Sequence, residues 1–250
     1  MTASLLKEPA CAILLDVEGT TTPIDFVYEV LFPYAREHVK GFLERHLSSE
    51  EVRTDIAALC EERAADFSRG LDPPAVLERP RESRLESIAA YVHWLMDQDR
   101  KSTPLKSLQG KIWEEGYRSG HLRSRIFPDV PPAFERWRGQ NKDICIYSSG
   151  SRLAQKLLFA HTEAGDLTGS IREYFDTRTG AKADPQSYRR IASALDISPA
   201  EIVFVSDVTG ELSAARSAGM QTLLSVRRGN RPQPDQDSYQ VIQTFDEILL

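Results

Sequence analysis

No long hydrophobic run occurs in this sequence. Nothing in it approaches the ~18 consecutive apolar residues that a membrane-spanning helix needs. The first nine residues also lack the apolar segment of a secretory signal. We therefore expect a soluble, cytoplasmic protein that has no membrane partner.

Cysteine and histidine are also scarce. The three cysteines, Cys11, Cys60 and Cys145, lie far apart, and two of them stand in apolar runs that resemble strands. An odd number at this spacing favours reduced core residues over disulfides. The five histidines form no H-x-x-x-H pair, and there is no C-x-x-C motif. The pattern therefore argues against a zinc site.

The sequence has no excess of basic residues. Its 31 lysines and arginines are outnumbered by 37 acidic residues, which gives a formal charge of −6. No basic field recruits nucleic acid, and we interpret the clusters at 79–84 and 227–231 as solvated surface. A chain of 250 residues with 41% hydrophobic residues can hold one large domain or a medium domain with an insert.

The stretch Ala10–Thr20 is the most informative part of the sequence. An unbroken apolar run ends abruptly at Asp16, Glu18 and Gly19. Such a run is typical of a parallel strand that is buried on both faces, and ligands bind outside the carboxyl ends of these strands. Carboxylates two residues apart on extended chain point the same way, so one acid can attack while the other transfers a proton. The alternative is that both acids merely close a strand.

Residues 22–125 are expected to be mostly helical. Apolar residues recur there at three- and four-residue intervals, and Pro33 should interrupt the first helix. Ser48 and Glu51 form a capping-box pattern before a second helix, a third runs from Ser87 to Asp97, and a fourth follows an N-cap at Thr103.

After residue 125 the pattern alternates between strands and helices. Strands are expected at 144–147, 174–175, 202–205 and 222–224, with helices at 153–159, 185–195 and 212–218. This alternation predicts an α/β fold with a doubly wound parallel sheet. The stretch 227–237 is interpreted as a loop without a functional signal, and a small helix is expected within 242–250.

The gap between the first strand and the second is too long for a simple crossover. We therefore predict that residues 1–21 and 126–250 form the α/β core domain, and that residues 22–125 form a helical cap domain inserted after the first strand. Because the insert leaves the core beside Asp16, it is placed where a lid belongs. A purely structural insert is the alternative.

Four groups are then expected at the carboxyl edge of the sheet: Asp16 with Glu18, Ser148 with Ser149, Lys182, and Asp207. Each is weak alone. In this order they resemble the four motifs of the haloacid dehalogenase superfamily, whose phosphatases use an aspartate nucleophile and one Mg²⁺ ion per subunit.

This resemblance implies a role for each residue. Asp16 would form an aspartyl-phosphate, and Glu18 would offer its backbone carbonyl to Mg²⁺ and its side chain for proton transfer. Ser148, Ser149 and Lys182 would bind the phosphate. Asp207 would be the acidic metal ligand, and Glu211 would support the site without binding the metal or the phosphate itself. The chemistry needs these types, because a phosphoryl group repels a carboxylate until cations neutralise it.

Further motifs resemble one family within that superfamily. The runs Asp16–Thr21, Pro23–Val27, Asp99–Lys106 and Ile146–Ser151 are similar to those of the enolase-phosphatases of methionine salvage, also called acireductone synthases. The resemblance covers about residues 12–226, and Glu18 replaces the aspartate that most superfamily phosphatases carry.

The family resemblance implies a reaction in two steps on a phosphorylated diketone, 2,3-diketo-5-methylthiopentyl-1-phosphate. Enolisation by loss of a C1 proton would be followed by hydrolysis of the enol phosphate to the acireductone 1,2-dihydroxy-3-keto-5-methylthiopentene. We expect a monomer, and we select Lys101 in the helical insert as the residue that stabilises charge on the diketone oxygens. A solvated loop lysine is the alternative.

Three other functions were weighed against this one. A capped phosphatase of the same superfamily could act on another small phosphate ester, such as a sugar phosphate or nucleotide. A dehalogenase would need neither Glu18 as a proton donor nor Asp207 as a metal ligand. A phospho-accepting receiver module also uses Asp, Lys and Mg²⁺, but an insert of about 100 residues beside the site favours substrate enclosure.

Overall fold

The computed structural model describes residues 9–100 and 102–249. The chain forms two compact units, one containing the chain up to Tyr28 and from Arg123 onward, the other Glu29–Leu122. The change points differ by a few residues from those expected, because the stems of the insert pack on each other. Arg125 lies over the ring of Phe26, with its guanidinium carbon 5.7 Å from the ring centroid, and reaches Asp25 at 3.9 Å.

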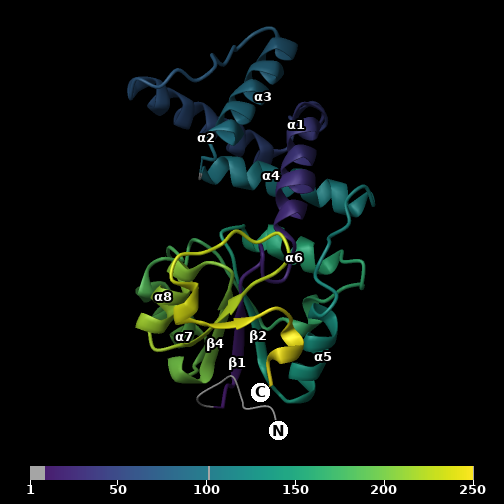
Figure 1. The fold of residues 1–250 in the computed structure, drawn as a ribbon. Coiled ribbons are helices and arrows are strands. Elements are labelled where there is room, and N and C mark those ends of the chain that lie inside the picture. The colour runs from purple at the N-terminus through teal and green to yellow at the C-terminus, as the bar shows by residue number, and fades with distance from the viewer. Residues whose placement is uncertain (1–8, 101, 250) are drawn as a thin grey trace. The chain divides into compact units, whose positions relative to one another are not determined.

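The α/β unit is built on a six-stranded sheet in which every neighbouring pair is parallel. The strand order is β3-β2-β1-β4-β5-β6 (Figure 1). The strands are β1 (Ala12–Leu15), β2 (Asp143–Tyr147), β3 (Glu173–Phe175), β4 (Ile202–Ser206), β5 (Gln221–Ser225) and β6 (Gln240–Ile242). The fold class expected from the alternating pattern is confirmed.

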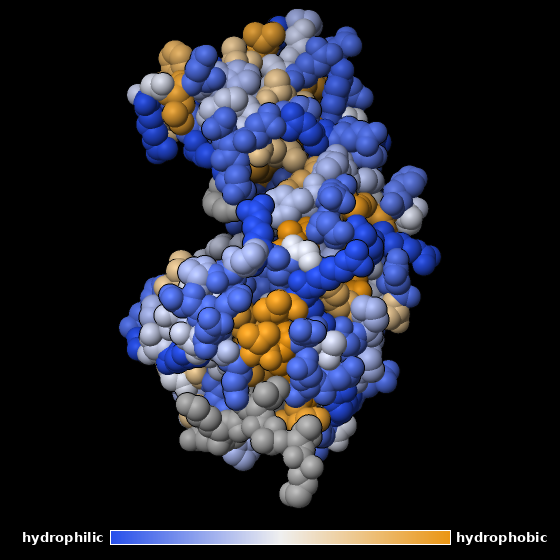
Figure 2. Space-filling view, viewed as in Figure 1, coloured by the Kyte–Doolittle hydropathy of each residue, from blue (hydrophilic) through white to orange (hydrophobic). Residues whose placement is uncertain are grey.

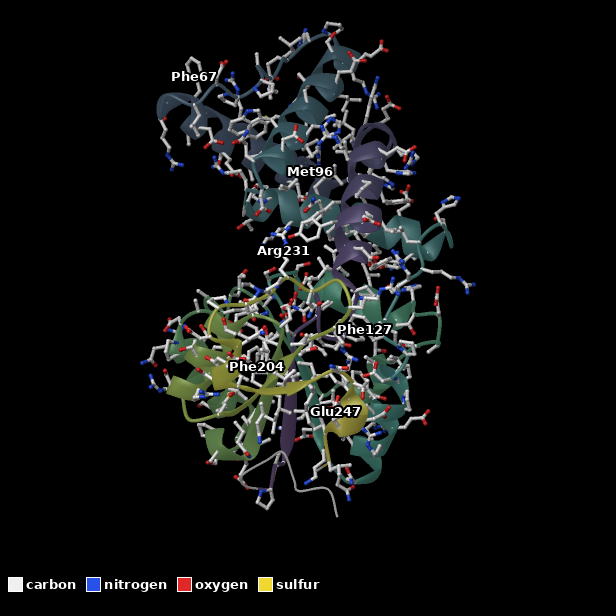
Figure 3. The ribbon with its side chains drawn as sticks, viewed as in Figure 1. Phe67, Met96, Phe127, Phe204, Arg231 and Glu247 are labelled. Carbon is white, nitrogen blue, oxygen red and sulfur yellow. The ribbon has the colours of Figure 1, made fainter. Side chains whose placement is uncertain are left out.

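β1 lies at the centre of this sheet because all four of its residues are apolar. Each is fully buried. Leu14 is paired with Cys145 of β2 on one side and Phe204 of β4 on the other, and Phe204 lies in the middle of the unit (Figure 3). Burial of such side chains contributes roughly 1.5–3 kcal/mol each. The central strand therefore holds the residue that follows it, Asp16, on a rigid base.

Helices cover both faces of the sheet. α7 (Pro185–Leu195) and α8 (Thr209–Ser217) lie on one side, and α5 (Val130–Gly139) and α6 (Arg152–Ala160) on the other (Figure 1). Tyr188 of α7 packs on Phe204, whereas Phe134 of α5 packs on Phe159 of α6. Asp184 caps α7 through its side chain, which accepts a hydrogen bond from the Gln186 amide at 2.9 Å. This cap and the following proline match the sequence signal.

The helical unit consists of four helices after a short π-helical turn. The elements are η1 (Phe26–Leu31), α1 (Phe32–His46), α2 (Glu50–Ser68), α3 (Arg81–Asp97) and α4 (Thr103–Arg118). Pro33 stands in the first turn of α1, where its missing amide costs nothing. The interruption expected at Pro33 is therefore the change from π-helix to α-helix.

Two helix starts in this unit differ from the expected ones. The capping box at Ser48 is wrong: α2 follows an N-cap at Ser49, whose side chain makes no capping hydrogen bond. The cap of α4 is Ser102, whose Oγ accepts from the Leu105 amide at 3.2 Å, and not Thr103. In both cases serine and threonine neighbours left the position of the cap open by one residue.

Polar contacts hold α2 to the rest of the helical unit. Asp66 is fully buried and accepts hydrogen bonds from the Tyr91 hydroxyl and Arg100, both at 2.9 Å. Further along α2, Asp55 pairs with Lys111 of α4 at 2.5 Å. At the other end, Phe67 points outward from the unit and is 63% exposed (Figure 3).

The C-terminal part of the chain corrects two expectations. β6 and a 3₁₀ turn, η5 (Phe245–Glu247), replace the helix expected within 242–250. Arg227 is not solvated surface: it is buried, pairs with Asp129 at 2.8 Å, and lies over the rings of Phe127 and Phe245. The remaining 3₁₀ turns are η2 (Thr168–Ser170), η3 (Pro199–Glu201) and η4 (Gln236–Ser238).

The face of the molecule that Figure 2 shows is mostly hydrophilic, with an apolar patch over the region of β6. Val241 of β6 is 42% exposed, and Val226 is 38% exposed. Within residues 9–100 and 102–249, no helix combines the length and apolarity needed to cross a membrane.

Candidate active site

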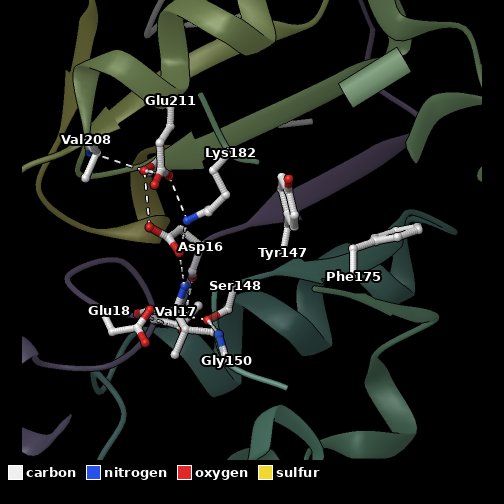
Figure 4. A network of polar contacts seen from close by, with 12 residues as sticks. Asp16, Val17, Glu18, Tyr147, Ser148, Gly150, Phe175, Lys182, Val208 and Glu211 are labelled. Atoms are coloured by element: carbon white, nitrogen blue, oxygen red, sulfur yellow. Dashed lines mark hydrogen bonds and ion pairs between the residues drawn. The ribbon is translucent and has the colours of Figure 1, made fainter. Parts of the chain in front are cut away.

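Polar residues gather at the carboxyl edge of the sheet, and all of them belong to the α/β unit. Asp16 directly follows β1, Ser148 follows β2, and Asp207 follows β4. Lys182 comes from the loop after β3 and reaches Asp16 (Figure 4). The parallel strands thus bring together groups that are up to 191 positions apart in the sequence.

Asp16 is almost fully buried, with 3% of it exposed, and three donor groups surround its carboxylate. Its Oδ1 accepts from Lys182 Nζ at 2.5 Å and from the Val17 amide at 2.7 Å. Its Oδ2 lies 3.2 Å from the hydroxyl of Ser206. These contacts fix the rotamer of the carboxylate, and fixed geometry is what a nucleophile requires.

The loop that carries Lys182 is fastened through its backbone. Tyr147 donates to the carbonyl of Gly180 at 3.0 Å, and Tyr188 donates to that of Lys182 at 2.8 Å. Gly180 has φ of 146°, and a Cβ there would come within 2.1 Å of Ser187 Oγ, so only glycine fits. The hydroxyls of two core tyrosines thereby position the lysine.

Lys182 stays protonated in this position. Burial alone would lower the pKa of the lysine, but the charges of Asp16 and Glu211 outweigh burial and raise it above its usual value. Lys182 Nζ lies 2.7 Å from Glu211 Oε2. The site therefore contains a fixed positive charge between two carboxylates.

Glu18 faces the phosphate-binding serine expected from the sequence. The Ser148 hydroxyl lies 3.4 Å from Glu18 Oε2 and accepts from the Gly150 amide at 3.1 Å. Burial of the carboxyl, followed by the negative charge of Asp16, raises the pKa of Glu18. A glutamic acid with a raised pKa can donate a proton near neutral pH. Ser149 is exposed, close to the start of α6.

Asp207 lies against the backbone that follows Glu18. A Cβ on Gly19, which has φ of 72°, would come within 2.4 Å of Asp207 Oδ2. The glycine therefore gives the carboxylate room to approach the turn after β1. Burial, together with the charges of Asp16 and Glu211, raises the pKa of Asp207 to about 7.

Two residues of the site were missed by the sequence interpretation. Ser206 lies between Asp16 and Glu211, with its hydroxyl 2.9 Å from Glu211 Oε2. Asn230 donates to the carbonyl of Gly19 at 2.9 Å from a loop that was interpreted as lacking function. The only signal for Ser206 was its place before Asp207, and nothing in the sequence pointed to Asn230.

The oxygen atoms of this edge suit a hard cation. The carboxylates of Asp16 and Asp207 directly follow the neighbouring strands β1 and β4. After burial, the negative charge of Asp16 is the next cause of the raised pKa of Asp207. Two carboxylates with a backbone carbonyl are typical of Mg²⁺, which keeps several of its waters. In the part of the chain that the structure describes, no three His, Cys, Asp or Glu side chains form a metal-binding group. Main-chain and water oxygens would thus complete the shell.

Comparison with known proteins agrees with this geometry. A family model described as haloacid dehalogenase-like hydrolase matches residues 12–219. The enolase-phosphatase E1 of Synechococcus elongatus is 50% identical over 238 residues, 94% of this chain and 96% of the relative. That of Drosophila melanogaster is 42% identical over 242 residues, 96% of this chain and 93% of the relative.

Solved structures give the same result. The UTR4 protein of Saccharomyces cerevisiae is 33% identical, with a TM-score of 0.76 over 95% of this chain and 99% of that one. CbbY from Rhodobacter sphaeroides, solved with phosphate, is 18% identical with a TM-score of 0.56 and supports the fold alone. The chain belongs to the enolase-phosphatase E1 family of the haloacid dehalogenase-like hydrolases.

Proposed function

We propose that this protein converts 2,3-diketo-5-methylthiopentyl-1-phosphate into 1,2-dihydroxy-3-keto-5-methylthiopentene and phosphate, the acireductone synthase step of methionine salvage. The observation that carries the proposal is Asp16 held at 2.5 Å by Lys182, in a chain 42–50% identical to relatives named enolase-phosphatase E1. A small phosphorylated diketone is the substrate.

In the phosphatase step, an Asp16 oxygen attacks phosphorus and the bond from phosphorus to the enol oxygen breaks. Glu18 protonates that leaving oxygen, which its raised pKa permits. Glu18 then accepts a proton from the water that cleaves the aspartyl-phosphate, so that Asp16 is regenerated and phosphate leaves. Lys182 offsets the charge of the transferring group throughout, while Ser148 and Ser149 bind its oxygens.

One Mg²⁺ ion per subunit fits the oxygen atoms described above. Asp16 and Asp207 would supply carboxylate ligands and Glu18 its backbone carbonyl. When bound, the ion neutralises phosphate charge and lets the nucleophile approach. Glu211 stays with Lys182 and Ser206, at 2.7 and 2.9 Å, and orients the lysine from behind.

We assign the enolisation step to the helical insert, residues 22–125, acting as a cap. The insert leaves the α/β unit beside the site: the Phe127 amide donates to the Thr21 carbonyl at 3.0 Å, so its two stems meet a few residues after Asp16. Lys101, the residue selected for charge stabilisation on the diketone, lies outside the described residues. Its neighbour Arg100 is bound to Asp66.

The test follows enol absorbance and phosphate release separately. Lys101→Met should slow enol formation on the order of a hundred- to thousand-fold, as loss of one preorganised donor does, and leave hydrolysis of an aryl phosphate within several-fold of wild type. Equal losses on both substrates would contradict the assignment. Turnover of a sugar phosphate or nucleotide in preference to the diketone would favour a general phosphatase instead.

A further inference from the structure

A cavity lies in the α/β unit, away from the catalytic carboxylates. It has a volume of about 570 Å³ and is formed by α6, η2 and the start of β3. β3 is the edge strand of the sheet, so the cavity opens at the rim of the unit. A volume of this size is within the range of small-molecule sites.

The charges that line this cavity are unusual for the chain. Arg152, Lys156 and Arg172 stand against one acid, Glu173, whereas the protein as a whole carries −6. Arg172 already pairs with Asp143, and Arg152 reaches Glu173 at 3.3 Å. Among the residues that the structure describes, Lys156 forms no ion pair with an acid; its Nζ lies 5.8 Å from the ring centroid of Tyr174.

The remaining walls are apolar and include one unsatisfied group. Leu157, Ala160 and Ile171 supply aliphatic surface. Tyr174 is 4% exposed, and its hydroxyl has no hydrogen-bond partner among the described residues.

The cavity is also tied to the phosphate-binding loop. Arg152 follows Ser151, the N-cap of α6. On the same helix, Gln155 donates to the carbonyls of Gly150 and Phe175 at 2.8 and 2.9 Å. A ligand between α6 and β3 would thus act on both elements that hold the loop behind Ser148.

We propose that this cavity is a second site for a small organic phosphate, and that its occupancy changes the affinity of the catalytic loop for phosphate esters. The charge of Lys156, which pairs with no acid among the described residues, and the positive charges of Arg152 and Arg172 beside it suit a phosphoryl group, and the aliphatic walls suit its organic part. The proposal does not depend on the diketone reaction.

Titration calorimetry with phenylphosphonate, which cannot be hydrolysed, tests the binding. We expect two binding events in the wild type. Lys156→Glu should weaken one of them at least about tenfold by placing a like charge in the site, and Ala160→Trp should remove the same event by filling the cavity. Arg138→Glu reverses an exposed charge on α5 and should keep both events. A single event in the wild type, or two unchanged events in Lys156→Glu, would overturn the site.

Kinetics test the coupling. Phenylphosphonate competes with an aryl phosphate substrate at the catalytic site, and this competition alone raises the apparent KM by a calculable amount. In the wild type the measured apparent KM should differ from that amount by about fivefold, which is the lower end of coupling between two sites. In Lys156→Glu the inhibition should become purely competitive, with kcat unchanged. Two binding events together with purely competitive inhibition in the wild type would refute the coupling.

Discussion

Buried charged side chains have opposite effects on stability in the two units. In the α/β unit, Asp16, Asp207 and Glu211 are crowded around a single lysine, and the pKa values of Asp207 and Glu211 are raised. A raised carboxyl pKa means that the ionised form is destabilised in the folded protein. The charges of Asp207 and Glu211 therefore reduce stability, and burial of the apolar sheet offsets this cost.

In the helical unit, the buried carboxylates are matched. Asp66 has Tyr91 and Arg100, and Asp55 has Lys111. The partly exposed Glu62 is matched too, because it accepts from the Ser102 hydroxyl at 2.6 Å. Removal of one partner from such a pair leaves a buried charge without compensation. Charge removal should therefore raise stability in one unit and lower it in the other, and the predictions below test this contrast.

The largest effect is expected for Asp16→Asn. The amide cannot attack phosphorus, so phosphate release should fall by several orders of magnitude. The substitution removes a negative charge beside Asp207 but also one of the two carboxylates that pair with Lys182, so the free energy of unfolding should change little. Burst assays and urea titration measure the two quantities. Near-normal turnover, with contamination excluded, would remove Asp16 from the role of nucleophile.

Asp207→Asn separates metal binding from stability. Activity should vanish with a chelator, return with Mg²⁺, and require far more Mg²⁺ in the variant, because one of two carboxylate ligands is lost. Unchanged Mg²⁺ dependence would exclude Asp207 from the metal shell.

The sign of the stability effect follows from the pKa. Asp207 titrates at about 7 when folded and near 3.8 when unfolded, so its penalty appears as the pH rises between these values. Without metal at about pH 8, Asp207→Asn should unfold at a higher urea concentration than wild type. Its free energy of unfolding should be greater by on the order of 2 kcal/mol. At about pH 4 the gain should disappear.

Asp66→Ala should show the opposite sign. It leaves the Tyr91 hydroxyl without its acceptor and Arg100 with Glu62 alone, at 3.7 Å. Loss of one partner of a fully buried pair costs about 3–5 kcal/mol, and because 28% of the Arg100 side chain is exposed, the loss here should stay at or below about 3 kcal/mol. Tyr91→Phe removes only one hydrogen bond and should cost about 1 kcal/mol. Urea unfolding and hydrogen exchange in α2 and α3 measure the loss. If Asp66→Ala is as stable as wild type, the matched charges do not stabilise the helical unit.

The sequence predicted the α/β unit more fully than its details. The apolar run before Asp16 is typical of a buried strand, and the parallel order of such strands indicates that Asp16 and Asp207, which follow two of them, lie at one edge of the sheet. The short strand β6 carries two exposed residues of three, so its pattern did not distinguish it from a loop. α5, which begins at Val130-Pro131-Pro132, was not anticipated either.

Contacts that depend on tertiary packing could not be predicted. Arg227 and Asn230 stand in a stretch rich in proline and charge, which is typical of a solvated loop. Arg227 is buried only because Phe127, Phe245 and Asp129, distant in sequence, converge on it. Asn230 acts through a backbone carbonyl, and no side-chain pattern reports such a contact.

The smallest effect is expected at Glu115, a half-exposed acid on α4 that binds Arg45 and, at 2.6 Å, His46 of α1. Partial burial alone would raise the pKa of Glu115, but hydrogen bonds from His46 and Arg45 outweigh it and lower the pKa. A lowered carboxyl pKa gives stability that is present above the unfolded value of 4.5 and is lost as the pH falls through the folded value. Since solvent screens the pair, Glu115→Gln should cost only about 0.5 kcal/mol at neutral pH.

Glu114→Gln is the matched control, because Glu114 lies on the same helix and, among the residues that the structure describes, forms its ion pair with the exposed Arg118 one turn away. Urea titration at neutral pH should separate the two variants, with Glu115→Gln the less stable. As the pH falls through the folded pKa of Glu115, which lies below 4.5, the carboxyl becomes protonated in wild type and this difference should close. A gap of equal size at neutral and at acid pH would mean that Glu115 acts through packing, and matched charges would then contribute less to the helical unit than Asp66 indicates.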